Sequence, residues 1–308
     1  MTTELICSYR FSVKNIISRG KGQSVVASAA YIARAKYKDD ELGKTFDYSK
    51  NKSPALVNEI LAPAISQSWI KDGEQFWNKV QKTEYRKNSQ FARPIELNLP
   101  HQLTVEQMID VLRDFCCQVF VSDGMIVQFA LHSPDIQNGG DNRNYHAHLL
   151  LTLRRTNEKG FCGNKVREWN KKSLLKEWRE HWSIACFNKL LALNMELEAC
   201  RWRYGYLTLK QQYNKAIERN DIEYALQACD HEPTRHKGVA ICALERKGIS
   251  SYVLEDRENE RLIAEKVRDD ITAEIKHEQT LLREKVHIKK IAKSYTKERV
   301  LTHTRQKV

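Results

Sequence analysis

The chain has 308 residues, enough for one large domain with an appendage, and its 51 Lys and Arg against 39 Asp and Glu give a net charge of +12. This excess favours a polyanionic partner such as nucleic acid, although a merely basic surface would carry the same charge. No segment is apolar over enough residues to cross a membrane, and the first residues lack the apolar stretch of a secretion signal, so we expect a cytoplasmic protein.

The first 120 residues alternate strand-like and helix-like patterns. Alternating polarity predicts a strand, and apolar residues three or four apart predict a helix. The predicted order is a strand at 4–14, a helix at 24–40, a polar connector at 46–57, a helix within 66–92, a strand at 95–100 and a helix at 105–120. Ser24 follows a basic, glycine-containing loop and is a typical N-cap for the first helix.

Two short apolar strands come next, joined by a loop of polar turn residues. They cover 124–132 and 144–154, and a single loop of this kind between two strands most simply makes an antiparallel pair. The rest of the chain is predicted to be helical at 172–199, at 207–228 and, with high charge, from about 254.

His146 and His148 stand at the head of the second apolar strand with one residue between them. A side-chain period of two puts both on the same face of the strand. His132 ends the preceding strand, and antiparallel pairing would bring it beside them. Three imidazoles from adjacent strands can hold a catalytic ion that keeps open positions. The alternative is that His132 caps its strand while the other two histidines make ordinary hydrogen bonds.

On a basic protein, such an ion would most economically act as a Lewis acid on a phosphodiester. The reaction also needs a nucleophile, either water or a side chain. No serine lies in a nucleophile elbow, and the cysteines have no evident activating neighbour. Tyr31 lies among small residues in VVASAAYIAR, which would let a DNA backbone approach closely. A helix tyrosine is more often a packing residue, and Tyr48 is the second candidate.

An ordered series of motifs resembles the MobA/MobL plasmid mobilisation relaxases of the MobQ class. It opens with SYRFSVKNIISRGKGQSVVASAAYIAR and continues through FDYSKNK, EILAP, FWNKVQKTEYRKNSQFAR, GMIVQFALH, NYHAHLLLTLR and VREWNKKSLLKEWREHW. The resemblance covers about residues 5–205, with a weaker continuation to about 250. Such relaxases are HUH endonucleases, and the sequence HAH at 146–148 matches the motif of two histidines around a hydrophobic residue.

This resemblance implies an α+β fold: a central antiparallel sheet with packed helices, as in HUH relaxases, plus a C-terminal helical extension. It implies a relaxase catalytic core at 1–205, a helical segment at 206–252 that completes or packs on the core, and a charged C-terminal helix at 253–308. The implied partners are single-stranded origin-of-transfer DNA, accessory mobilisation proteins and a secretion-system coupling protein, without membrane insertion.

The resemblance also implies a chemistry. Mg²⁺ or Mn²⁺ would be held by His132, His146 and His148, and Tyr31 would attack one phosphate at the plasmid transfer origin. The protein would then be joined to the 5′ phosphate of the nicked strand, with a 3′-hydroxyl freed, so that the same enzyme could rejoin the strand after transfer.

Residues 92–94 read Ala-Arg-Pro where the family commonly reads Ala-Arg-Glu. That glutamate would orient a metal-ligating histidine or its water. Glu96 lies two residues further on, hence on the same strand face, and is the first candidate to replace it; Glu84 is the second. Because Pro94 puts this carboxylate in question, a non-catalytic single-strand DNA-binding protein with the same fold stays open as an alternative.

Five basic residues within the family-like motifs are candidates for DNA phosphate contacts: Lys14, Arg19, Lys21, Arg86 and Lys87. Taken singly, each could equally be a solvated surface charge. A rolling-circle replication initiator or transposase of the same superfamily is a further alternative. The motif order opposes it, because here the tyrosine precedes the HxH pair.

Overall fold

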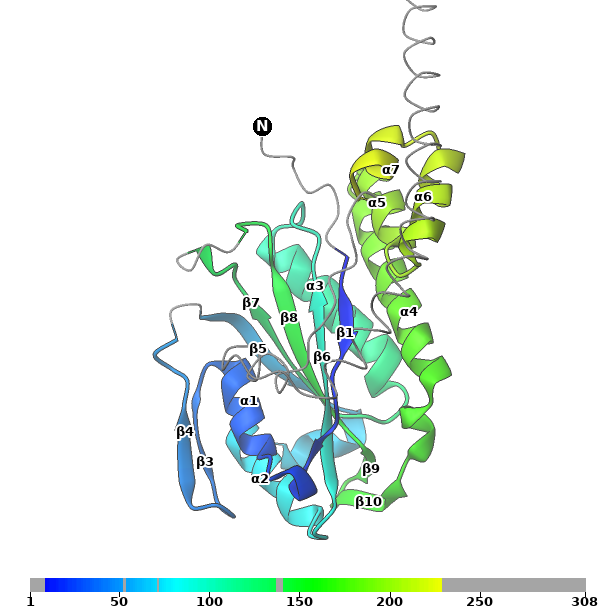
Figure 1. The fold of residues 1–308 in the computed structure, drawn as a ribbon. Coiled ribbons are helices and arrows are strands. Elements are labelled where there is room, and N and C mark those ends of the chain that lie inside the picture. The colour runs from blue at the N-terminus through cyan, green and yellow to red at the C-terminus, as the bar shows by residue number, and fades with distance from the viewer. Residues whose placement is uncertain (1–8, 52–53, 71, 137–140, 229–308) are drawn as a thin grey trace, which may run out of the picture. The chain divides into compact units, whose positions relative to one another are not determined.

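In the computed structural model, a six-stranded antiparallel sheet carries the helices (Figure 1). The structure describes residues 9–51, 54–70, 72–136 and 141–228. Along the sheet the strands are β1 (Phe11–Val13), β6 (Gln90–Asn98), β8 (His146–Thr152), β7 (Val127–His132) and β5 (Ala55–Leu61), and β2 (Ile17–Ser18) also pairs with β6. The α+β fold with a central antiparallel sheet is confirmed. The predicted segments from residue 229 onward, including the charged helix at 253–308, lie outside the described residues.

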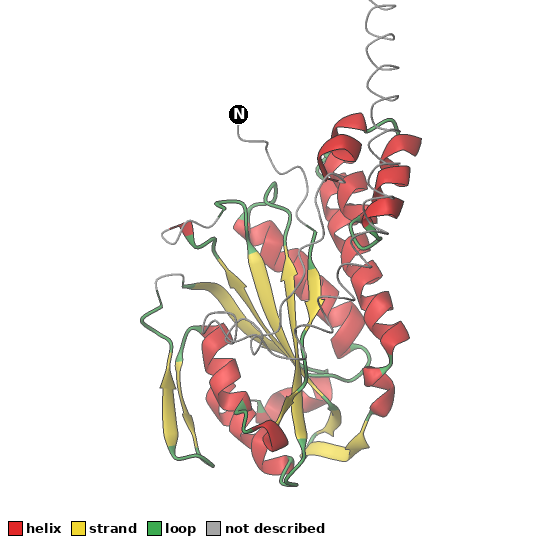
Figure 2. Cartoon of the chain, viewed as in Figure 1, coloured by secondary structure: helices red, strands yellow, loops and turns green. Residues whose placement is uncertain are grey.

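Helices cover both faces of the sheet (Figure 2). In β8, Leu149 and Leu151 pack with α3 (Val105–Cys116) and α4 (Lys172–Leu191), whereas Leu150 packs with α1 (Val25–Ala33) and α2 (Gly73–Thr83). Burial on both faces explains why this strand is almost continuously apolar. It also means that the alternate face of β8, which carries the two histidines, is the face under α1.

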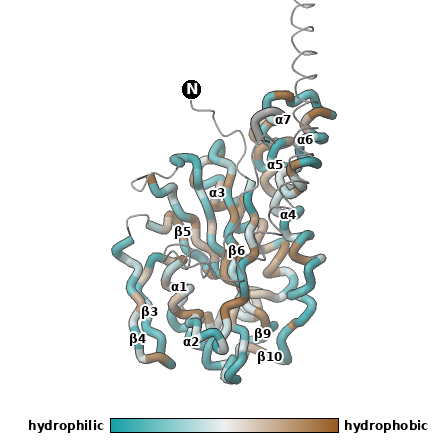
Figure 3. Tube along the Cα trace, in the orientation of Figure 1, coloured by the Kyte–Doolittle hydropathy of each residue, from teal (hydrophilic) through white to brown (hydrophobic). Residues whose placement is uncertain are grey.

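The first helix begins as predicted but ends earlier. The Ser24 hydroxyl accepts a hydrogen bond from the Ala27 amide at 3.0 Å. The prediction that the helix reaches residue 40 is wrong, because Arg34 takes a left-handed backbone conformation with φ of 52° and ends it. Residues beyond it form a hairpin of β3 (Lys36–Asp39) and β4 (Lys44–Asp47). Figure 3 shows the change, from white and brown in α1 to mostly teal in this hairpin.

Two strands differ from their predicted extents. β5 begins inside the segment predicted as a polar connector, at Ala55, and continues beyond it to Leu61. β6 begins at Gln90 instead of residue 95, so Pro94 lies inside it. The Pro94 carbonyl accepts from the Lys14 amide at 3.0 Å, so its imide nitrogen also faces the β1 and β2 side. On that side, β6 pairs with β2 up to Ala92 and with β1 from Ile95, so position 94 lies in the gap between the two pairings. The N–H that proline lacks is therefore not needed by a partner strand.

The remaining helices are shorter than their predicted spans. Within the segment 66–92 the α-helix is limited to α2, which follows a short 3-10 helix at Ala64–Trp69 and precedes the start of β6. The segment 172–199 divides near Asn194 (φ 58°), and 207–228 divides near Asn220 (φ 61°). The resulting helices after α4 are α5 (Glu196–Tyr204), α6 (Leu209–Glu218) and α7 (Ile222–Ala228). A second hairpin, β9 (Arg154–Asn157) with β10 (Gly160–Lys165), was not predicted.

The helix at 105–120 was predicted with nearly its observed extent. It begins with a capping box between Thr104 and Gln107 and continues from Cys116 into a short π-helical turn. None of the helices that the structure describes is both long enough and apolar enough to span a membrane.

Candidate active site

The antiparallel pairing of β7 and β8 brings three histidines together. His132 lies opposite His146 in the register, and His148 is two residues further along on the same face. Their ring centroids are 4.8–5.4 Å apart, and one nitrogen from each ring lies within 4.8 Å of the others. This is the cluster expected from the HxH pair and the end of the preceding strand.

Hydrogen bonds fix which nitrogen carries the proton in two of these rings. His132 Nε2 lies 2.7 Å from the Ile32 carbonyl oxygen, which can only accept, so Nε2 is protonated and Nδ1 carries the lone pair. His146 Nδ1 lies 3.1 Å from the Asn144 carbonyl oxygen, so in the neutral form of this ring Nε2 carries the lone pair. A backbone carbonyl behind a histidine is the usual way to orient a metal ligand.

The environment keeps two of the three histidines uncharged. Burial lowers the pKa of His132 to about 4, and burial together with the neighbouring histidines lowers the pKa of His148 to about 3. Both rings are therefore neutral near pH 7, as metal ligation requires. Asn98, opposite His146 in the register, has a buried side-chain oxygen without a hydrogen-bond partner among the described residues. A water held at the cluster would satisfy it.

These depressed pKa values predict a pH-dependent stability in the absence of divalent ions. An unfolded histidine titrates near 6.5, so between pH 6.5 and about 3 the unfolded chain binds a proton that folded His148 does not. The free energy of unfolding should fall as the pH is lowered through this window, by about 5 kcal/mol from His148. Urea denaturation of wild type and His148→Gln at several pH values measures this. Equal pH dependence in the two proteins would contradict it.

Tyr31, on the last turn of α1, lies beside this cluster. Its ring centroid is 6.0 Å from that of His148 and 5.4 Å from that of Tyr48, and 41% of the residue is exposed. The two tyrosines and His148 line a cleft of about 560 Å³ with Lys14 and Glu96. An accessible phenol next to three imidazoles is an arrangement in which a phosphate could reach both.

Arg34 is a residue of this site that the sequence did not single out. Its guanidinium carbon lies 4.5 Å from the Tyr31 ring centroid, and Nη2 lies 3.3 Å from His132 Nδ1. The only signal in the sequence was a basic residue three positions after Tyr31. Its approach to His132 depends on the left-handed turn at the end of α1, which residue spacing does not reveal.

Glu96 lies on the face predicted for it. It is opposite His148 in the β6–β8 register, which places their β-carbons about 5 Å apart. Its carboxylate is ion-paired with Arg10 at 3.0 Å and Lys14 at 3.2 Å. The carboxylate therefore adds negative charge next to the histidine cluster and positions Lys14 at the edge of the cleft.

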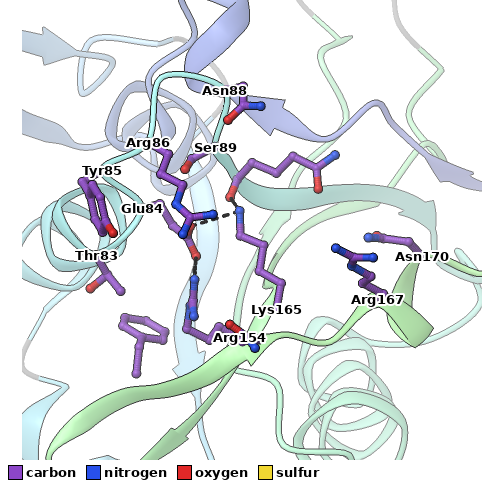
Figure 4. Close-up of a pocket in the computed structure, with 13 residues that line it drawn as sticks. Thr83, Glu84, Tyr85, Arg86, Asn88, Ser89, Arg154, Lys165, Arg167 and Asn170 are labelled. Atoms are coloured by element: carbon purple, nitrogen blue, oxygen red, sulfur yellow. Dashed lines mark hydrogen bonds and ion pairs between the residues drawn. The ribbon is translucent and has the colours of Figure 1, made fainter.

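Glu84, the second carboxylate candidate, is not brought to the histidines. It is buried and ion-paired with Arg154 at 3.1 Å and Lys165 at 3.0 Å (Figure 4). Arg154 follows the far end of β8, six residues beyond His148, and six residues of strand span about 20 Å. Glu84 instead lines a separate pocket of about 830 Å³, to which Arg86 and Arg167 also contribute cations.

The structure separates the five basic candidates into different surroundings. Lys14 lines the tyrosine cleft, and Arg86 lines the Glu84 pocket. Arg19 donates to the backbone oxygens of Gln81 and Glu84 and forms an ion pair with Glu41, so much of its hydrogen-bonding capacity is used within the protein. Lys21 and Lys87 are exposed.

The chain matches a family model and several known proteins. The model of the MobA/MobL family matches residues 23–247. The chain is 33% identical over 253 residues to the conjugal transfer protein TraA of Agrobacterium fabrum, a match that covers 76% of this chain and 21% of that protein. It is 27% identical over 258 residues to the mobilization protein MobL of Acidithiobacillus ferridurans, covering 78% of this chain and 64% of that one.

Among solved structures, the chain is similar to one described as the molecular basis of vancomycin resistance transfer in Staphylococcus aureus. The two share 32% sequence identity with a TM-score of 0.54, over 61% of this chain and 94% of the other. The chain therefore spans about a fifth of the length of the TraA protein but matches most of this shorter solved chain.

Proposed function

The chain belongs to the MobA/MobL family, and from that membership we propose that it is a relaxase, which nicks and rejoins one strand at a plasmid transfer origin for conjugative mobilisation. The observation that carries the proposal is that Tyr31 lies beside a cluster of three histidines, one of which, His148, lines the same cleft. We place the catalytic core within residues 1–205, which contain all of these groups.

His132, His146 and His148 would hold a divalent ion. The available lone pairs fit such an ion with bound water, and so does the Asn98 side-chain oxygen, which has no hydrogen-bond partner in the part of the chain that the structure describes. An all-imidazole set favours a transition metal such as Mn²⁺ over Mg²⁺, which prefers oxygen ligands. When bound, the ion would supply positive charge to a non-bridging phosphate oxygen and to the leaving oxygen.

Tyr31 would supply the nucleophile. Its phenol gives up a proton to water, the bond from the Tyr31 oxygen to phosphorus forms, and the bond from phosphorus to the 3′-oxygen breaks. The 3′-oxygen takes up a proton from water and leaves as a hydroxyl. The tyrosine is then esterified to the 5′ phosphate. Reversal of the same steps rejoins the strand, because the ester conserves the energy of the broken bond.

The substrate would be single-stranded DNA whose backbone passes through the tyrosine cleft. Lys14 lies at that cleft, and the basic pocket at the other end of the sheet offers Arg86 for a second part of the DNA. These contacts, like those with accessory mobilisation proteins and a coupling protein, are part of the proposal.

Glu96 is proposed to replace the missing family carboxylate. Glu96→Gln should weaken Mn²⁺ affinity by about tenfold, as the loss of groups behind metal ligands does. Isothermal titration of the purified chain measures the change. A matched control is Glu59→Gln, which also removes a strand carboxylate that is paired with an arginine, Arg113, at 2.8 Å. If Glu84→Gln weakened ion affinity while Glu96→Gln did not, the role would belong to Glu84.

A cleavage assay tests the proposed function directly. The full chain is incubated with Mn²⁺ or Mg²⁺ and labelled single-stranded oligonucleotides that tile the DNA flanking its coding region. We expect one oligonucleotide to be cut at one position, with a covalent protein–DNA adduct on a denaturing gel. Binding of these oligonucleotides without any cleavage or adduct would favour the non-catalytic alternative that Pro94 keeps open.

A further inference from the structure

Arg34 contacts both the proposed nucleophile, Tyr31, and the proposed metal ligand His132. Its guanidinium lies over the Tyr31 ring, Nη1 donates to the Tyr31 carbonyl oxygen at 3.3 Å, and Nη2 donates to His132 Nδ1 at 3.3 Å. The residue has a φ of 52°, a backbone conformation that non-glycine residues adopt at some cost and that recurs at functional sites. The last turn of α1 thus directs a cation toward a proposed metal ligand.

The nitrogen that Arg34 contacts is the one a metal would need. His132 Nε2 is occupied by its bond to the Ile32 carbonyl, which leaves Nδ1 with the only lone pair of that ring. A guanidinium has donors and no acceptor, so Arg34 must take this same lone pair. One lone pair cannot serve a hydrogen bond and a metal at once. Positive charges on Arg34 and on a divalent ion would also repel each other at this distance.

We propose that Arg34 and the divalent ion exchange at His132: Arg34 holds Nδ1 in the ion-free protein, and when the ion enters, its guanidinium moves to the phosphate attacked by Tyr31. This rests on the proposed function. The released guanidinium stays attached three residues from Tyr31, so it remains beside the nucleophile. Its planar fork of donors fits two phosphate oxygens, and a fixed donor there would stabilise the charge that develops in the transition state.

The exchange predicts effects of opposite sign on two measurements. Arg34→Gln removes the competing charge and should tighten Mn²⁺ binding to the DNA-free chain by about three- to tenfold in isothermal titration. The same change should slow adduct formation on a cleavable oligonucleotide at saturating Mn²⁺ by about 100-fold, as loss of a transition-state donor does. Arg34→Lys keeps the charge and should change both quantities less. General damage to the site would weaken both measurements together.

Arg155→Gln is the matched control, because the Arg155 guanidinium also lies over an aromatic ring, that of Trp169 at 5.3 Å, and is paired with Asp123. It should leave Mn²⁺ affinity unchanged. Equal Mn²⁺ affinity in wild type and Arg34→Gln would overturn the exchange while leaving the relaxase proposal intact, and so would unchanged adduct formation in Arg34→Gln. A wild-type chain that binds no Mn²⁺ would instead remove the proposed metal site itself.

Discussion

Tyr31→Phe is expected to keep its fold, its divalent ion and its affinity for single-stranded DNA, and to lose strand cleavage. The substitution removes one hydroxyl and almost no volume from a side chain that is 41% exposed, so neither packing nor charge changes much. If the phenol is the nucleophile, cleavage should fall by on the order of 10⁴-fold or more, as loss of a covalent nucleophile does in other enzymes. The covalent adduct that resists denaturation should vanish with it.

Tyr48→Phe provides the matched control for this experiment. Tyr48 lines the same cleft, with its ring 5.4 Å from that of Tyr31, so a general effect of the lost hydroxyl would appear in both variants. The Tyr48 variant should still form the adduct. A label placed on the 3′ side of the nick should travel with the protein, because the tyrosine holds the 5′ phosphate. An adduct from Tyr31→Phe, or one that carries the other fragment, would mean a different nucleophile or a different reaction.

Alanine at His146 or His148 is expected to abolish most divalent-ion binding and nearly all cleavage. Two remaining imidazoles do not hold an ion such as Mn²⁺ at micromolar concentration. Isothermal titration with Mn²⁺ measures the affinity. His181→Ala, which removes an exposed histidine from α4, should bind as wild type does. Unchanged affinity in both cluster variants would rule out the three-histidine site.

The three histidines differ in how much their replacement by alanine should lower the stability of the protein. α1 covers this part of the sheet; His146 and His148 are half-buried beneath it, whereas His132 is fully buried. His132→Ala would remove the partner of the buried Ile32 carbonyl and one of the hydrogen-bond acceptors of Arg34, and an unpaired buried group costs about 1–3 kcal/mol. His146→Ala and His148→Ala are therefore the cleaner tests of ion binding.

The sequence predicted best where a single local pattern determined the structure. The antiparallel β7–β8 pair follows from two apolar runs and one polar loop, and the three-histidine cluster follows from that pairing. Ser24 caps its helix as predicted for a short polar side chain at that position. Each of these features depends on residues that are close together in the chain, so a single sequence is enough to predict it.

The sequence predicted the structure less well where contacts between residues far apart in the chain determine it. Residues 55–61 are mostly apolar but do not alternate in polarity as a strand with one buried face does, and they form β5 by pairing with β7. The early end of α1 depends on the backbone of Arg34, a residue that spacing alone would leave in the helix. The position of Glu84 depends on Arg154 and Lys165, about 70 and 80 residues further along the chain.

The bond from His132 to the Ile32 carbonyl ties the proposed nucleophile helix to the proposed metal ligand through the main chain. Every residue has a carbonyl, so side-chain replacement at position 32 leaves the acceptor in place as long as the helical turn survives. The type of amino acid at position 32 is therefore determined by its contacts with the core under α1. Its role in orienting His132 does not restrict which amino acid stands there. The connection between the helix of Tyr31 and His132 is therefore visible only in the three-dimensional structure.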